Sequence, residues 1–141
     1  MRPPVPPEHA YGHAFIVVPA DIDELGHANN VVWLRWVNEA AIAHTRAVGI
    51  DRAFYAEHGV IWVVRSHAIE YLAPALEGED LVALTWVEAM RGATSLRRTI
   101  FRRGADGRAL AHAETLWALI DTATGRPRRV PPEIAGRYGP G

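Results

Sequence analysis

The stretch DIDELGHANNVVWLRWVNEAAIAHTRAV, residues 21–48, decides how we expect the chain to fold. Its second part has helical periodicity from about Asn30 to Val48. Asn29 or Asn30 can cap the helix start, because an Asn side chain accepts hydrogen bonds from the free N–H groups of the first turn, and Gly49 ends it. Because most of the circumference is apolar, other parts of the structure must enclose this helix. Its polar residues form one stripe: Arg35, Asn38, Glu39 and Arg46.

Several other segments have the β-branched and aromatic residues that are typical of strands. Short connections rich in turn residues join them, which favours antiparallel pairing, and Asp106-Gly107 predicts a tight hairpin. Both faces of residues 109–121 are apolar, so this strand should lie inside the sheet. A short segment, residues 50–59, could hold a helical turn. The predicted strands are residues 14–18, 60–71, 80–90, 96–103 and 109–121.

These patterns predict an α+β fold, in which one strongly curved antiparallel sheet wraps around one long central helix. We expect a single domain over residues 1–141, with residues 1–13 as a flexible leader and residues 126–141 as a tail on the surface. The outer face of the sheet still carries Trp and Ile side chains. Association with a second copy of the chain is therefore expected.

The composition excludes several classes of protein. The chain has 141 residues, of which 49% are hydrophobic, and this fits one globular domain. A formal net charge of −1 does not suit binding of nucleic acid through bulk charge. The absence of cysteine excludes disulfides and thiolate metal sites. No signal peptide or membrane-spanning run of about 20 apolar residues is present. We expect a soluble, cytoplasmic protein without nucleic-acid or membrane partners.

The polar first part of the opening stretch has the groups needed for acyl transfer. The backbone N–H groups of Gly26, His27 and Ala28 lie at or just before the predicted helix start, where free N–H groups and the helix dipole stabilise an anion. Asp23 could supply a base or a nucleophile beside them. A purely structural interpretation stays open, in which Asp21 and Asp23 form turn hydrogen bonds and the cluster performs no chemistry.

Metal-binding interpretations fit the same residues poorly. A calcium loop that starts at Asp21 would need an oxygen ligand at its fifth position and Glu at its twelfth, but these positions hold Leu25 and Val32. His27 shares no helical face with a second His, and the seven His of the chain are scattered. We therefore expect no metal.

The sequence Asp23-x-x-Gly26-His27-x-Asn29-Asn30, followed by an aromatic residue and Leu34, resembles the N-terminal signature of the hotdog-fold acyl-CoA thioesterases. The branch is that of the 4-hydroxybenzoyl-CoA thioesterases and the YbgC/FadM-like proteins. The resemblance extends over roughly residues 15–134. Further segments that carry it are Val63-Val64-Arg65, Ile69-Glu70-Tyr71, Ala73-Pro74-Ala75 and residues 90–96.

The resemblance implies hydrolysis of an acyl-CoA thioester to a free acid and coenzyme A. It implies no cofactor, since coenzyme A is part of the substrate. It also implies a homo-oligomer, a dimer or a dimer of dimers (a homotetramer), in which two protomers pair their sheets and the active sites lie at the interface.

Residue by residue, the resemblance places Asp23 on the catalytic carboxylate, as a general base or a nucleophile. The backbone N–H of His27 falls on the oxyanion donor, and its side chain is a candidate for orienting Asp23 or water. Gly26, Ala28 and Asn29 would complete the oxyanion loop.

The resemblance gives weaker indications of where the rest of the substrate would bind. The candidates for substrate contacts are Trp62, Val64, Thr94 and Ser95. The candidates near the nucleotide phosphates are Arg91, Arg97 and Arg102, for which a solubilising role on the sheet or a contact with the tail is the alternative. Relatives often have tyrosine at the position of Trp33 and arginine at the position of Ala41. The resemblance therefore does not identify the acyl group of the substrate.

Two further interpretations within this fold remain open. The first is a hotdog hydratase or dehydratase that acts on acyl thioesters, and the second is a non-catalytic acyl-CoA binding module.

Another hotdog branch uses a helix glutamate as its catalyst. Here Glu39 shares a stripe with Arg35, so an exposed or ion-paired role is expected.

Overall fold

The computed structural model describes residues 2–139 and shows an antiparallel sheet with helices on one face. Within these residues the sheet has the strand order β1-β3-β4-β5-β2, and each neighbouring pair is antiparallel. The interior position of β5 confirms the prediction from its two apolar faces. The elements are β1 (Tyr11–Ile16), η1 (Pro19–Asp21), α1 (Asn30–Ala47), α2 (Arg52–His58), β2 (Val60–Tyr71), β3 (Asp80–Arg91), β4 (Thr94–Arg103), β5 (Ala109–Asp121), α3 (Pro132–Ala135) and η2 (Gly136–Tyr138).

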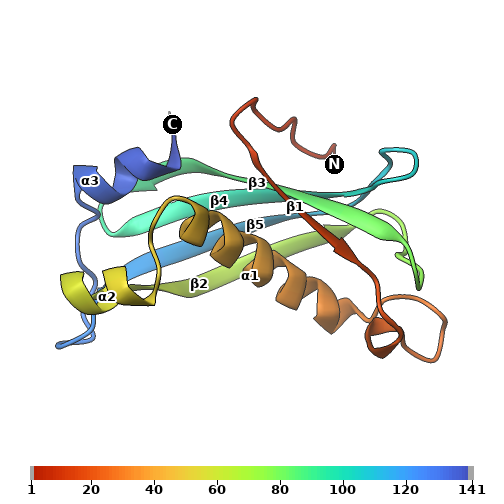
Figure 1. Cartoon of the computed structure of the whole chain (residues 1–141), viewed down its shortest axis with the longest axis horizontal. Coiled ribbons are helices and arrows are strands. Elements are labelled where there is room, and N and C mark those ends of the chain that lie inside the picture. The colour runs from red at the N-terminus through yellow and green to blue at the C-terminus, as the bar shows by residue number, and fades with distance from the viewer. Residues whose placement is uncertain (1, 140–141) are drawn as a thin grey trace.

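Helix α1 begins and ends close to the predicted residues. The Asn29 side chain caps it by accepting a hydrogen bond from the Val31 N–H at 2.9 Å. Beyond its end, Gly49 has a φ of 86°, a conformation that glycine adopts without strain. Figure 1 shows α1 lying across the sheet, with α2 and α3 near its C-terminal end and the loop that leads into it at the opposite end.

The sheet covers only one side of α1 in the single chain. Trp33, Trp36 and Val37 are buried against the sheet, but Val31 is 71% exposed and Ile42 is 43% exposed. The chain also forms the short helices α2 and α3, so α1 is not its only helix. A helix enclosed on all sides therefore stays a prediction for a larger assembly.

The core beneath the first half of α1 is an aromatic cluster. The ring centroid of Trp33 lies 4.8 Å from that of Trp36 and 5.2 Å from that of Phe101, both in edge-to-face geometry. Phe15 of β1 packs on Trp36 with a centroid distance of 4.9 Å. Such pairs add to the stability gained by burial of apolar area, and they fix the start of α1 on the sheet.

The C-terminal segment is not a tail on the surface, as the sequence had suggested. Ile134 and Tyr138 are only 2% and 4% exposed, and they join a second core cluster with Ile50, Phe54 and Leu119. The high proline and arginine content of residues 126–141 made the burial of this segment hard to predict, because the two buried side chains are single residues among largely polar neighbours. The segment closes the end of the molecule at which α1 ends.

The predicted leader is also shorter than expected. Strand β1 begins at Tyr11, not at residue 14, and ends at Ile16, not at residue 18. Gly12 and His13 pair with Leu84 and Ala83 of β3. Backbone pairing with β3 therefore extends the strand through residues whose side chains give no strand signal.

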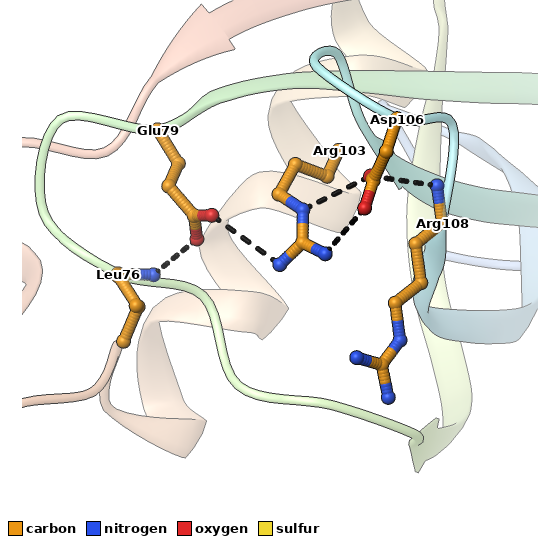
Figure 2. Close-up of polar contacts among 5 residues, drawn as sticks. All are labelled: Leu76, Glu79, Arg103, Asp106 and Arg108. Carbon is orange, nitrogen blue, oxygen red and sulfur yellow. Dashed lines mark hydrogen bonds and ion pairs between the residues drawn. The ribbon is translucent and has the colours of Figure 1, made fainter.

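A polar network holds the connection between β2 and β3 in place (Figure 2). The Arg103 guanidinium donates to both carboxylate oxygens of Asp106, at 3.0 and 2.6 Å, and lies 3.4 Å from Glu79. Glu79 accepts the Leu76 N–H at 2.6 Å, and Asp106 also accepts the Arg108 N–H at 3.1 Å. The Arg103 side chain, followed by the Arg108 N–H, lowers the pKa of the Asp106 carboxyl to about 2. This network orders the connection that leads from β2 past the start of α1.

None of the helices in residues 2–139 has the length and apolar character needed to cross a membrane.

Candidate active site

The loop between η1 and α1 is a compact turn held by its own backbone. The Asp23 N–H donates to the His27 carbonyl at 2.9 Å, and the Gly26 N–H donates to the Asp23 carbonyl at 3.0 Å. Gly26 has a φ of 80°, and a Cβ built there would meet no atom within 4 Å. The turn therefore requires glycine for its backbone angle and not for lack of space.

Only one of the three expected oxyanion donors in this loop is unused. The N–H of Gly26 is taken up inside the turn, and the N–H of Ala28 donates to the Ala75 carbonyl at 2.9 Å. The N–H of His27 has no hydrogen-bond partner among residues 2–139. This donor lies three residues before the first residue of an 18-residue helix, and a donor near a helix N-terminus is suited to an anionic oxygen.

The Asp23 carboxylate lies in the same loop and is partly free. Its Oδ1 accepts the Leu25 N–H at 2.9 Å, which is the turn hydrogen bond of the structural interpretation. Its Oδ2 has no partner in the described part of the chain. Asp23 is half-buried and lines an open hollow of about 500 Å³ together with Ile22, Glu24, Leu25 and Asn29. One carboxylate oxygen thus fixes the loop and the other is available for chemistry.

Asp21, two residues earlier, has a purely structural role. It is 2% exposed, accepts the Val18 N–H at 3.0 Å and forms an ion pair with Arg35 at 2.6 Å. The hydrogen bond and charge of Asp21 raise the pKa of Arg35. Arg35 also reaches Glu39 at 3.2 Å, so the expected ion pair of Glu39 is confirmed. These bonds tie the loop to the first turns of α1.

The larger cavity of the molecule lies at the other end of α1. It has a volume of about 530 Å³ and lies between the last turns of α1, α2, β2, β4 and β5. At about 1.5 Å per residue, Thr45 in its wall lies roughly 22 Å along the helix from Asn30. Within one chain this cavity and the hollow beside Asp23 are therefore separate sites.

The four residues predicted to contact substrate are not brought together with Asp23 in one chain. Trp62 and Ser95 line the larger cavity, and the Trp62 indole N–H donates to the Tyr138 hydroxyl at 3.1 Å. Val64 lies on the edge strand β2 and is 38% exposed. The Thr94 hydroxyl donates to the Arg91 carbonyl at 2.8 Å in the turn between β3 and β4.

Of the two residues at which this chain differs from the family pattern, only one reaches the cavity. Ala41 lines it, whereas Trp33 belongs to the aromatic core beneath α1.

The expectation that Arg97 lies near phosphates or on a solvated face was wrong, whereas the alternative of a contact with the C-terminal segment is confirmed. The Cζ of Arg97 lies over the ring of Tyr138, 5.7 Å from its centroid. Arg97 is 3% exposed, and its Nη1 donates to His44 Nδ1 at 2.9 Å and to the Thr85 hydroxyl at 3.0 Å. The alternation of side chains along β4 could have indicated this burial. Arg97 shares a face of the strand with Thr99 and Phe101, whereas Arg98 lies on the other face. Burial lowers the pKa of Arg97 to about 10.

The contact with Arg97 defines the state of His44. A guanidinium can only donate, so His44 Nδ1 accepts and the imidazole is neutral. Burial, and then the charges of Arg97 and His9, lower the pKa of His44 to about 4. Tyr11 stacks on the imidazole with a centroid distance of 5.1 Å. His44 is therefore a structural acceptor for Arg97.

No group of three or more His, Cys, Asp or Glu side chains within residues 2–139 is arranged to hold a metal ion. The expected independence from metals stays a prediction.

Solved structures show the same fold. A Lactobacillus plantarum protein provisionally described as an oleoyl thioesterase has a TM-score of 0.86 and 22% identity, over 92% of this chain and 50% of that chain. This chain thus spans half the length of that protein. A 1,4-dihydroxy-2-naphthoyl-CoA thioesterase from Synechocystis has a TM-score of 0.83 and 16% identity, over 92% and 95% of the two chains. A DHNA-CoA thioesterase from Staphylococcus aureus has a TM-score of 0.82 and 19% identity, over 92% and 88%.

These likenesses establish the fold, and the family follows from the sequence. No curated protein matches the chain. The family model of the thioesterase-like superfamily, however, matches residues 17–138, which include the loop at Asp23, the whole sheet after β1 and the buried C-terminal segment. The resemblance drawn from the Asp23–Asn30 motif is thereby confirmed at the level of the superfamily. The chain belongs to the thioesterase-like superfamily.

Proposed function

We propose that the protein hydrolyses the thioester of an acyl-CoA to a free acid and coenzyme A at the loop that leads into α1. The observation that supports this most strongly is the presence of two unused groups in one turn: the Oδ2 of Asp23 and the N–H of His27. A nucleophile or base beside a preorganised donor is what acyl transfer requires.

In the proposed reaction the thioester carbonyl docks at the N-terminus of α1. Asp23 either takes a proton from an attacking water or attacks the carbonyl carbon itself, and the carbonyl oxygen becomes an oxyanion. The His27 N–H stabilises this oxyanion, and one such donor is typically worth about 3 kcal/mol. The C–S bond then breaks, coenzyme A leaves as a thiolate and the acid is released. In the nucleophilic variant, water hydrolyses the acyl-Asp23 anhydride in a second step.

The remaining loop residues would maintain this geometry. The Asn29 cap and the Asp21–Arg35 ion pair fix the loop on α1, and the Ala28–Ala75 hydrogen bond fixes it on the connection between β2 and β3. The His27 side chain is exposed, so it can turn toward water or Asp23 without cost in burial.

We propose that a second copy of the chain shelters the acyl group, because the hollow beside Asp23 is open. Strand β2 is a 12-residue edge strand, and Ile61, Val63 and Val64 on it are each 37–39% exposed. A long apolar edge is a natural surface for pairing with another sheet. A dimer through β2, alone or doubled into a tetramer, would also cover the exposed side of α1. Arg91 and Arg102 remain the candidates for the CoA phosphates, and the cytoplasm remains the proposed location.

The test is free-thiol release from a panel of acyl-CoAs that runs from short aliphatic through long aliphatic to aromatic acyl groups. We expect hydrolysis of at least one class, and no hydration of crotonyl-CoA. Hydration without thiol release would favour a hydratase. A thermal shift with acyl-CoAs, with no turnover of any of them, would favour a binding module and contradict the proposal.

A further inference from the structure

The larger cavity contains a buried cation that has no anionic partner. Arg97 is one of the residues that line it, and no carboxylate within residues 2–139 forms an ion pair with this guanidinium. The guanidinium does contact the ring of Tyr138, whose centroid lies 5.7 Å from Cζ, but this ring carries no negative charge. Burying a charge without a counter-ion is costly, so an arginine is seldom placed in such a position. Its pKa of about 10 leaves the guanidinium protonated at neutral pH.

Most of the hydrogen-bonding capacity of Arg97 is unused. A guanidinium has five N–H donors in a planar fork. Nη1 uses its two on His44 and Thr85. The N–H of Nε and the two of Nη2 have no partner in the described part of the chain. His44 and Thr85 therefore hold one side of the guanidinium, and the edge formed by Nε and Nη2 stays free. This is an edge with which an arginine can bind a carboxylate bidentately.

Trp117 lines the same cavity. Its indole Nε1–H is buried out of reach of the cavity and has no hydrogen-bond partner among residues 2–139. Trp117 of β5 is directly opposite Ser95 of β4, and Arg97 lies two residues further along β4. Residues two apart on a strand share a face and are separated by about 7 Å, which the length of an arginine side chain can span. Arg97 and Trp117 therefore approach the cavity from one face of the sheet, Arg97 with its unpaired donors and Trp117 with its ring.

The other walls are mainly apolar and aromatic, with Ile42, Tyr55, Trp62 and Tyr138 among them, and would contact the rest of a ligand. Two further arginines and one aspartate, from the end of α1 and the start of α2, also line the cavity. The Tyr138 hydroxyl is already occupied by Thr45 and by the Trp62 indole N–H, both at 3.1 Å. A volume of about 530 Å³ is within the usual range for small-molecule sites. The cavity thus offers an apolar chamber with unsatisfied donors on its sheet side.

We propose that this cavity binds a small organic acid with an apolar body, whose carboxylate accepts hydrogen bonds from the Nε and Nη2 of Arg97. The carboxylate supplies the missing counter-charge, and the alkyl or aryl body packs between the aromatic side chains. The site is separate from the Asp23 loop of the same chain. The proposal concerns binding alone and does not depend on thioester hydrolysis.

The test is isothermal titration of the full chain with 4-phenylbutanoate and with its neutral isostere 4-phenylbutanamide. We expect the acid to bind at least roughly 10-fold more tightly than the amide. In Arg97→Gln this preference should disappear, whereas Arg98→Gln should retain it. Arg98 is the matched control, because it is the adjacent residue on β4, faces the other way and pairs with Glu88 and Glu114. Equal binding of acid and amide by the wild-type protein, or equal effects of the two variants, would overturn the proposal.

A second measurement keeps the inference testable if Arg97→Gln fails to fold. Trp117→Phe removes the unpaired N–H but keeps an aromatic ring, and it identifies the Trp117 indole signal in a ¹H–¹⁵N spectrum. The acid should shift this signal in the wild-type protein, because Trp117 lines the cavity, and the amide at the same concentration should shift it less. An indole signal that responds equally to acid and amide would contradict the proposal.

Discussion

The two ends of α1 present different chemistry. At the N-terminal end the loop is open, and the unused groups are one carboxylate oxygen of the half-buried Asp23 and a backbone N–H. At the C-terminal end lies a cavity, and the unused groups belong to the side chains of the buried Arg97 and the half-buried Trp117. The helix dipole favours this arrangement, since it stabilises anions at the start of a helix and cations near its end. Arg97 contacts α1 at His44, in its last turn.

The same contrast appears on a smaller scale between two carboxylates of one loop. Asp21 uses both oxygens to hold the structure, whereas Asp23 uses one. Asp21→Ala should therefore lower the free energy of unfolding by roughly 3 kcal/mol, because it removes a buried N–H acceptor and a short charged hydrogen bond. Urea denaturation measures this effect. Asp23→Ala, the matched control, should cost about 1 kcal/mol or less. Equal losses in the two variants would show that Asp23 also has a mainly structural role.

The C-terminal end should be sensitive to acid through His44. Its pKa is about 4 in the folded protein and about 6.5 when the chain is unfolded. Below pH 6.5 the unfolded chain binds a proton that the folded chain does not, so stability falls with decreasing pH. This group should lower the free energy of unfolding by about 2 kcal/mol between pH 7.5 and pH 5.

His44→Gln removes this titration. The variant should therefore show a shallower loss of stability over the same pH range in denaturation curves, even if it is less stable at pH 7.5. Parallel pH profiles of the two proteins would contradict the assignment of a neutral His44 beside Arg97.

The turn at the N-terminal end depends on the backbone of one residue. Gly26→Ala should cost about 1–2 kcal/mol, because its φ of 80° is unfavourable for any residue with a Cβ. It should also reduce thioester hydrolysis by displacing the His27 N–H. Gly136→Ala is the control, since its φ of −65° suits alanine and a Cβ there meets no atom within 4 Å. A thermal denaturation comparison in which both variants behave alike would exclude strain at Gly26.

The smallest effect concerns the cap of α1. Asn29→Ala should cost about 1 kcal/mol, because the Val31 N–H loses its acceptor. Asn30→Ala should cost less, since the Asn30 side chain makes no capping hydrogen bond among the described residues. Chemical denaturation of the two variants distinguishes them. A larger loss of stability in Asn30→Ala would show that Asn29 is not the capping residue.

The sequence predicted the N-terminal end of α1 better than its C-terminal end, for a physical reason. The Asn29 cap, the turn at Gly26 and the interior strand β5 each follow from local chemistry or from the period of a single segment. The cavity at the C-terminal end instead combines α1, α2, β2, β4, β5 and η2, which are far apart in the chain. Neither the burial of Tyr138 nor the missing counter-charge of Arg97 has a local signature.

Asp21 and Asp23 illustrate the limit of residue spacing. Two aspartates two residues apart were predicted either to point the same way or to form turns, and the sequence did not distinguish their roles. Their difference arises from Arg35, fourteen residues after Asp21, which α1 brings back over the loop. The structure therefore separates a carboxylate that holds the fold from one that is available to a substrate.

The most direct test of the account compares Asp23→Asn with Glu24→Gln in thiol release from whichever acyl-CoA the wild-type protein hydrolyses fastest. Both residues line the hollow before α1, and both substitutions remove one negative charge there. The account predicts that Asp23→Asn lowers kcat by about 1,000-fold or more with an unchanged melting temperature, and that Glu24→Gln changes kcat by less than about 3-fold. Full activity in Asp23→Asn, or equal losses in the two variants, would contradict it.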